Sequence, residues 1–332
     1  MALIAADATA AVFDRVRQTA QCTVTAGYYR LTFHAMSTRC GVSFRTIDPR
    51  LAQEYQDEVL RWVAWFEARY SRFIPESLIS RINAAAGEHW VEVDAETDAL
   101  FDLCQEMIFF TRGVFDPTAA PLIQLWNWKA SPPAIPTQSQ ITAAQELTGW
   151  RRIERRHGGI FLPHAGMSLD LGGIGKEYAV DRVCTMALQR GIENVLVDFG
   201  QDVRVHGQPP EKGAWHIGLE DPQQPGRCWT GVAVTNHAVA TSGDYLRHFT
   251  RNGRRFGHII DPRTGWPVHN SVLAVSVIAP HCTFAGILST AAFVLGPKEG
   301  MEMMALCPGV EGAIITDNQR VLSKNFYNYA TA

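Results

Sequence analysis

The stretch "SLDLGGIGKEYAVD" (Ser168–Asp181) decides how the rest of the chain is interpreted. An apolar, strand-like start leads into three glycines, and Lys176 then opens what reads as the first turn of a helix. Backbone N–H groups at a helix start suit a phosphate, and Lys176 would add a point charge. The spacing matches neither the P-loop nor G-x-G-x-x-G. Taken alone, the stretch favours a tight corner between packed elements over a phosphate cradle.

The composition is that of a globular protein without the signature of a nucleic-acid binder. Of the 332 residues, 46% are hydrophobic and 19% are charged, and the formal net charge is −3. The chain has no run of 18 or more apolar residues, so we expect no membrane span. Its seven cysteines are widely spaced and include no C-x-x-C pair, which favours reduced thiols over a disulfide framework or a zinc site.

Residues 1–27 lack a basic segment followed by an apolar block, because Asp7 and Asp14 interrupt them early. They read as an amphipathic helix or a loose leader rather than as a signal peptide. Residues 28–332 are expected to form one domain with two lobes, since no flexible linker or internal repeat divides them. We therefore expect a cytoplasmic protein, and a periplasmic one stays open.

The periodicity of the chain predicts an α+β fold. Residues 28–48 read as two strands joined by a short turn at Ser37 and Thr38, because they are rich in β-branched and aromatic side chains. Residues 49–71 carry apolar side chains at helical spacing. Residues 272–280 predict a strand, and residues 282–296 a helix with an apolar face. We expect a helical part mainly before residue 150 and a mixed sheet after it.

Four loops combine a carboxylate with turn-forming residues and, in most cases, a small hydroxyl. They are "FDPTAAPL" (Phe115–Leu122), "VDFGQDVRVHG" (Val197–Gly207), "VATSGDYLRHF" (Val239–Phe249) and "GHIIDPRTGWPV" (Gly257–Val268). Each one singly is most simply a turn whose side chain bonds its own backbone. Four in one chain favour a shared polar site, because loops at strand ends are where sites are assembled.

Together with "AMST" (Ala35–Thr38), "YSRFIPESLISRIN" (Tyr70–Asn83) and "FAGILSTAAFVLG" (Phe284–Gly296), these stretches resemble the ApbE family of FAD:protein FMN transferases. The resemblance runs from about Phe33 to the last strand. It implies a two-lobed, T-fold-like α+β architecture with a mixed or antiparallel sheet core and flanking helices. It also implies FAD as substrate, Mg²⁺ as metal, and transfer of FMN through a phosphoester to a Thr or Ser of an acceptor flavoprotein, with release of AMP. The acceptor would carry an Asp-x-x-(Ser/Thr)-Gly-Ala segment.

The resemblance also assigns roles to residues of this chain. Lys176 would contact the diphosphate, and His258 and Asp261 would face the reacting phosphate, with His258 suited to proton transfer. These three are the expected catalytic residues. The expected cofactor-binding residues are Met36, Thr38, Asp116, Thr118, Lys176, Thr241, Ser242, Gly243, Asp244 and His258.

The metal site is where the chain departs most from the family. The resemblance implies a backbone carbonyl from Gly175, a hydroxyl from Thr290 and an aspartate at position 286, but Gly286 stands there. Magnesium prefers hard oxygen ligands, and carboxylates supply most of the protein's share. Losing this one should weaken metal binding, and Gly286→Asp is expected to strengthen it. Positions 286 and 290 lie one helical turn apart, so both would face the ion.

Three further departures fall in the site loops: Ser37 and Glu177 stand where the family usually has glycine, and so does Gln201. Two hypotheses follow. Either the protein is an active transferase in which Glu177 or a water stands in for the missing aspartate, or it is a non-catalytic flavin-binding relative that acts as a carrier, chaperone or regulatory partner.

Overall fold

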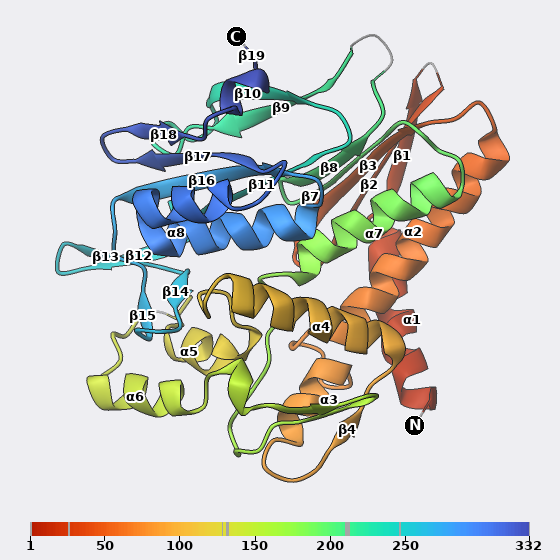
Figure 1. Ribbon diagram of the computed structural model, residues 1–332. Coiled ribbons are helices and arrows are strands. Elements are labelled where there is room, and N and C mark those ends of the chain that lie inside the picture. Colours follow the sequence, from red (N-terminus) through yellow and green to blue (C-terminus); the bar gives the residue numbers. More distant parts are fainter. Residues whose placement is uncertain are drawn as a thin grey trace.

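The structure is a computed structural model that describes residues 2–25, 27–127, 129–130, 133–209, 213–245 and 247–331, with side chains from residue 8 onward. It has a sheet-containing lobe and a smaller, mainly helical lobe (Figure 1). Among the described residues, none of the helices has the length and apolar character needed to cross a bilayer.

A nine-stranded sheet forms the centre of the larger lobe, and every neighbouring pair in it is antiparallel. The antiparallel core with flanking helices confirms the α+β prediction. In spatial order its strands are β1 (Gln21–Thr25), β2 (Tyr28–Ala35), β3 (Thr38–Arg45), β7 (Val195–Phe199), β8 (Asp202–His206), β11 (Ala238–Gly243), β16 (Val272–Ala279), β17 (Glu311–Thr316) and β18 (Arg320–Leu322).

Three helices cover one face of this sheet: α2 (Pro49–Tyr70), α7 (Gly175–Gln189) and α8 (Cys282–Ala305). Helix α2 begins where the sequence predicts, because the Asp48 carboxylate caps the Arg50 N–H at 2.8 Å and Pro49 occupies the first turn. Its apolar stripe is buried, as the spacing indicated. Helices α7 and α8 contact each other along the sheet (Figure 1).

The opposite face of the sheet is covered near the C-terminal strands by a small sheet. Strands β9 (Trp215–Glu220), β10 (Cys228–Val234) and β19 (Ala330–Thr331) form it, next to the short helix η3 (Phe326–Asn328). Trp215 and Val232 share a core there with Val205 and Ile278 of the main sheet. This layer leaves the α7–α8 side as the side that meets the second lobe (Figure 1).

The N-terminal segment packs onto the sheet lobe. Helix α1 (Ala2–Gln18) contacts α2, with Val16 buried, and β1 pairs with β2 at the sheet edge. Of the two expectations for residues 1–27, the helix is the one observed, and a strand follows it.

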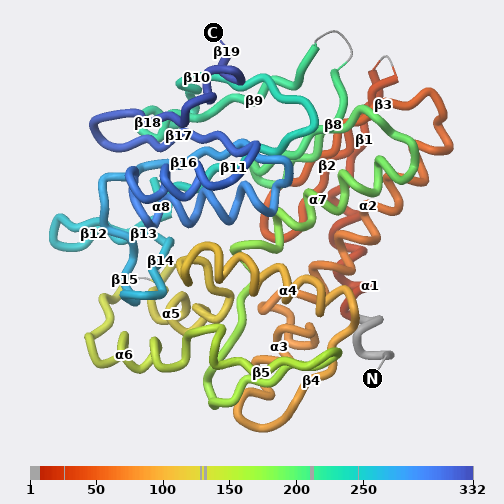
Figure 2. Tube along the Cα trace, viewed as in Figure 1, coloured from red at the N-terminus to blue at the C-terminus, as the bar shows by residue number. Residues whose placement is uncertain are grey.

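The second lobe holds the remaining helices and a three-stranded sheet. Its elements are α3 (Leu78–Ala84), β4 (Val91–Glu92), α4 (Ala95–Phe110), η1 (Pro117–Ala119), α5 (Ala120–Leu125), α6 (Gln138–Glu146), η2 (Trp150–Arg152), β5 (Glu154–Arg156) and β6 (Gly159–Phe161). Helix α4 lies along the boundary between the lobes (Figure 2). The rings of Phe110 on α4 and Phe284 on α8 are 6.2 Å apart, so the lobes are packed together.

Two hairpins leave the sheet lobe beside α8, and the second of them runs toward the second lobe (Figure 1). They are β12 (His248–Arg251) with β13 (Arg254–Gly257), and β14 (Ile260–Asp261) with β15 (Trp266–Pro267). Trp126 of the second lobe stacks on Phe256, with ring centroids 5.8 Å apart, and contacts Trp266. The segment that carries His258 and Asp261 is thereby fixed against both lobes.

Candidate active site

The turn before α7 is a packed corner whose N–H groups are largely used within the protein. Gly175 N–H donates to the Leu171 carbonyl at 2.7 Å, and Gly172 N–H donates to the Asp170 carboxylate at 2.8 Å. The same carboxylate pairs with Arg72 at 2.7 Å. The second lobe fixes the turn through Pro117, whose carbonyl accepts the Asp170 N–H at 2.8 Å. The turn therefore positions its neighbours, in agreement with the corner interpretation.

Lys176 forms an ion pair with Asp202, a contact that the sequence did not predict. Its ammonium contacts the carboxylate of Asp202, at the start of β8, and Asp202 is buried. Glu177 Oε1 lies 3.5 Å from the same ammonium. Asp202 was visible as a carboxylate at a strand end, but the chain offers no local signal that it faces a lysine on a helix. The positive charge expected at the diphosphate is thus already compensated in part.

The most unexpected feature of the site is the contact between Glu177 and Gly286. A Cβ atom built on Gly286 would lie 2.6 Å from Cγ and 3.3 Å from Oε1 of Glu177. The glutamate on α7 therefore occupies the space that a side chain at position 286 of α8 would need. Glu177 is only 8% exposed, and its Oε2 has no hydrogen-bond partner among the described residues. Gly286→Asp alone would require Glu177 to move.

Hydroxyl groups join the end of β11 to α8. Ser242 Oγ lies 2.7 Å from Ser289 Oγ and 2.8 Å from Thr290 Oγ1. Thr241 bonds to Ser276 on the neighbouring strand β16 instead, at 2.8 Å. Adjacent residues of a strand point to opposite faces. Ser242 and Thr290 therefore lie together on the α8 side, whereas Thr241 lies on the other side of the sheet.

Gly243 and Asp244 shape the chain after β11. A Cβ on Gly243 would lie 2.9 Å from the Leu273 carbonyl oxygen, so a larger residue would be crowded there. Asp244 is buried and forms an ion pair with Arg255 of β13. Burial raises the pKa of Asp244, and the Arg255 charge opposes that shift. Asp244 thereby anchors the β12–β13 hairpin.

His258 lies between the two hairpins and is half-buried. Burial lowers its pKa to about 4, and the nearby charge of Arg247 acts in the same direction. The imidazole is therefore neutral at physiological pH. Its Nδ1 lies 3.3 Å from the Arg247 carbonyl oxygen, so Nδ1 carries the proton and donates it there. The basic lone pair is then on Nε2, which suits a proton acceptor.

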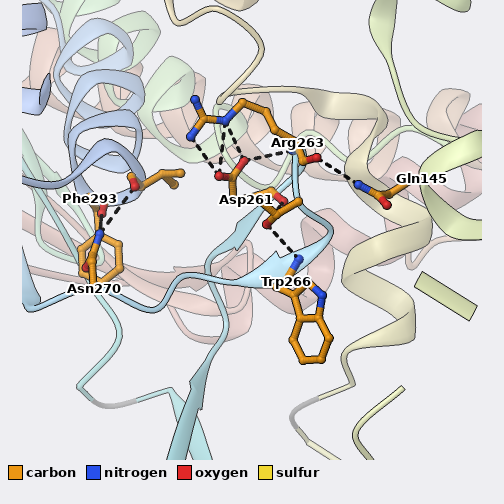
Figure 3. Close-up of polar contacts among 8 residues, drawn as sticks. Gln145, Asp261, Arg263, Trp266, Asn270 and Phe293 are labelled. Carbon is orange, nitrogen blue, oxygen red and sulfur yellow. Dashed lines mark hydrogen bonds and ion pairs between the residues drawn. The ribbon is translucent and has the colours of Figure 1, made fainter. Parts of the chain in front are cut away.

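Asp261 forms the base of the β14–β15 turn (Figure 3). Its carboxylate accepts from the backbone N–H and the guanidinium of Arg263, all at 2.9 Å. The second lobe holds this turn through Gln145, which donates to the Arg263 carbonyl at 3.0 Å, and Trp126, which donates to the Gly265 carbonyl at 2.7 Å. Asp261 thus fixes the shape of the segment after His258.

Asp116 and Thr118 join η1 to η2. The Asp116 carboxylate accepts from the Thr118 N–H at 2.8 Å and from the Trp150 N–H at 3.1 Å. Thr118 is fully buried, and its hydroxyl accepts from the Gly149 N–H at 2.6 Å. Burial raises the pKa of Asp116, and these hydrogen bonds oppose the shift. Both side chains form hydrogen bonds inside the second lobe.

Met36 and Thr38 lie at the β2–β3 turn. Met36 and Ser37 both have positive φ angles, 49° and 59°, so the turn holds a serine in the left-handed region that glycine adopts without strain. The Met36 N–H donates to the buried Glu67 carboxylate at 2.9 Å. Thr38 packs against Gly200, where a Cβ would lie 2.5 Å from its hydroxyl. The turn is fixed close to the end of β7.

The described residues contain no group of three or more His, Cys, Asp and Glu side chains that could hold a metal ion. Oxygen donors in the α7–α8 region include the Gly175 carbonyl, the Glu177 carboxylate and the Thr290 hydroxyl. These are hard ligands of the kind that suits Mg²⁺. The buried Oε2 of Glu177, which has no hydrogen-bond partner among the described residues, fits such a cation.

Comparison with known proteins agrees with this architecture. The sequence model of the ApbE family matches residues 36–314. The FAD:protein FMN transferase of Treponema pallidum is 33% identical over 265 residues, which cover 74% of this chain and 72% of that protein. The FAD:protein FMN transferase of Vibrio cholerae is 30% identical over 249 residues, 74% of this chain and 75% of that protein.

Solved structures are similar over nearly the whole chain. The ApbE protein of Thermotoga maritima aligns with a TM-score of 0.82 at 31% identity, covering 92% of this chain and all of that one. The flavin transferase ApbE of Vibrio cholerae aligns with a TM-score of 0.81 at 25% identity, covering 93% and 99%. The sequence match and the shared architecture lead to one conclusion: the chain belongs to the ApbE family.

Proposed function

We propose that this protein transfers FMN from FAD to a Thr or Ser hydroxyl of an acceptor protein, forming a phosphoester and releasing AMP. Two relatives named FAD:protein FMN transferase are 33% and 30% identical to it. The observation in the structure that carries the proposal is the state of His258. A neutral imidazole whose Nδ1 donates to the Arg247 carbonyl has its lone pair on Nε2, and this nitrogen can accept the proton of the acceptor hydroxyl.

In the proposed reaction, the acceptor hydroxyl oxygen bonds to the phosphorus on the riboflavin side of the FAD diphosphate. The bond from that phosphorus to the bridging oxygen breaks, and AMP leaves with the oxygen and the electron pair. The hydroxyl proton passes to Nε2 of His258. Lys176 stabilises negative charge on the diphosphate, at a position fixed by Asp202.

Three groups would hold a magnesium ion here: the Gly175 carbonyl, the Glu177 carboxylate and the Thr290 hydroxyl. When bound, Mg²⁺ supplies charge neutralisation at the phosphate oxygens. Asp244 and Asp261 contribute indirectly, because they fix the two hairpins on either side of His258.

The alternative function is a flavin-binding protein without transferase activity, acting as a carrier, chaperone or regulatory partner. Two observations favour it: position 286 has no carboxylate, and the Lys176 charge is already paired with Asp202. This alternative predicts that FAD binds and stays intact.

Incubation of the purified protein with FAD, Mg²⁺ and an acceptor carrying an Asp-x-x-Thr-Gly-Ala segment separates the two. Transfer gives covalent flavin fluorescence on the acceptor in a denaturing gel and an equimolar amount of AMP. An acceptor with valine in place of the threonine is the control. FAD binding without AMP or labelled acceptor would leave the carrier function standing and remove the transferase.

A further inference from the structure

Glu177 is a buried carboxylate that its surroundings leave incompletely paired. It is 8% exposed, and Oε2 has no hydrogen-bond donor within the described part of the chain. The nearest cation, Lys176, lies 3.5 Å from Oε1 and itself contacts Asp202. A buried carboxylate oxygen without a partner is energetically unfavourable. A bound cation would remove this cost, because no described residue donates to Oε2.

Helix α8 has a glycine where the Glu177 side chain packs against it. Gly286 on α8 leaves the space that the Glu177 side chain fills, since a Cβ there would lie 2.6 Å from Cγ of Glu177. A side chain at position 286 and the observed position of Glu177 are therefore mutually exclusive. The α7–α8 interface has room for one carboxylate at this point, and α7 provides it.

Hydroxyl oxygens lie on the same edge of α8. Thr290 is one helical turn after Gly286, so its Cβ is about 5–6 Å from the position of a Cβ at 286. Its hydroxyl is held by Ser242 at 2.8 Å. A carboxylate and a hydroxyl on facing helices are oxygen donors that a small divalent cation can share, and one carboxylate oxygen has no partner among the residues that the structure describes.

We propose that Glu177 is the carboxylate ligand of a divalent cation bound between α7 and α8, and that the carboxylate has exchanged helices with position 286. The cation's use in catalysis rests on the proposed function, but its binding does not. Gly286→Asp alone would place two carboxylates in the space of one, so we expect it to weaken metal binding, the opposite of the expectation from the sequence.

Mn²⁺ titration followed by electron paramagnetic resonance, without flavin or acceptor, tests the proposal. We expect Glu177→Gln, which keeps the shape of the side chain, to weaken Mn²⁺ binding at least tenfold. The double variant Glu177→Gly/Gly286→Asp returns the carboxylate to α8 and should bind within a few-fold of the natural protein. Glu88→Gln, at an exposed glutamate, is the matched control and should change nothing.

Two results would overturn the proposal: no Mn²⁺ binding by the natural protein at millimolar concentration, or equal binding by Glu177→Gln. Circular dichroism of each variant verifies folding. The transfer assay, run in parallel, keeps the two proposals separate. Weakened Mn²⁺ binding in Glu177→Gln with no FMN transfer by any variant supports the ligand and removes the function. Unchanged binding together with active transfer removes only the ligand.

Discussion

Two kinds of carboxylate in this protein differ in how their oxygens are satisfied. Asp116, Asp244 and Asp261 lie in the loops around the site, and each is paired with a donor from the protein itself. Glu177, between α7 and α8, keeps one oxygen without a partner in the described structure. In the sequence all four look like polar residues near glycine or proline. A carboxylate near the site has a structural role when the protein supplies its hydrogen-bond donors. It is available to a ligand when one of its oxygens lacks a donor.

Replacing His258 should have the largest effect on the rate of FMN transfer. This residue lies between the two hairpins that Asp244 and Asp261 fix. We expect His258→Ala to lower the rate of FMN transfer about 10²–10⁴-fold while FAD still binds, since only proton transfer is lost. The rate of AMP release measures the first quantity and flavin fluorescence titration the second. His269→Ala, at an exposed histidine, is the control. A His258→Ala variant with the natural rate would mean that the proton acceptor lies elsewhere.

Replacing Asp116 tests whether the paired carboxylates stabilise the fold. We expect Asp116→Ala to lower the free energy of unfolding by about 1–3 kcal/mol, because the buried Trp150 N–H would lose its acceptor. Urea denaturation measures this change. If stability stayed the same while flavin affinity fell sharply, Asp116 would be a ligand-binding residue, as the family resemblance first suggested.

The protonation of His258 should appear in the pH dependence of stability. Its pKa is about 4 in the folded protein and 6.5 when unperturbed, so the unfolded chain takes up the proton first as pH falls. The His258 contribution is fully present above pH 6.5 and is lost between pH 6.5 and about 4. Allowing for partial exposure, we expect about 1–2 kcal/mol. Urea titrations at several pH values should show this loss in the natural protein and not in His258→Gln.

Glu177 should give the smallest change in stability. In metal-free protein we expect Glu177→Gln to alter the free energy of unfolding by less than about 1 kcal/mol, or to raise it, because no hydrogen bond to Oε2 is lost. Urea denaturation in the presence of a chelator measures this. A loss as large as that expected for Asp116→Ala would show that Glu177 is a structural carboxylate after all, and the comparison would fail.

The local elements were predictable because their signals are local. The apolar spacing of residues 49–71 indicated an amphipathic helix, which the structure shows at Pro49–Tyr70. The polar break at Ser37 set the β2–β3 turn. The order and spacing of the site loops were enough to indicate the family, since they are properties of the chain itself.

The sequence by itself thus determined the elements, the fold class and the family. Tertiary structure alone decided which polar groups meet. Lys176 faces Asp202 from another element, and Glu177 fills the space beside Gly286 on the opposite helix. Positions 177 and 286 are 109 positions apart in the sequence, so nothing local links them. Packing of α7 against α8 couples them, since two side chains cannot occupy the same volume.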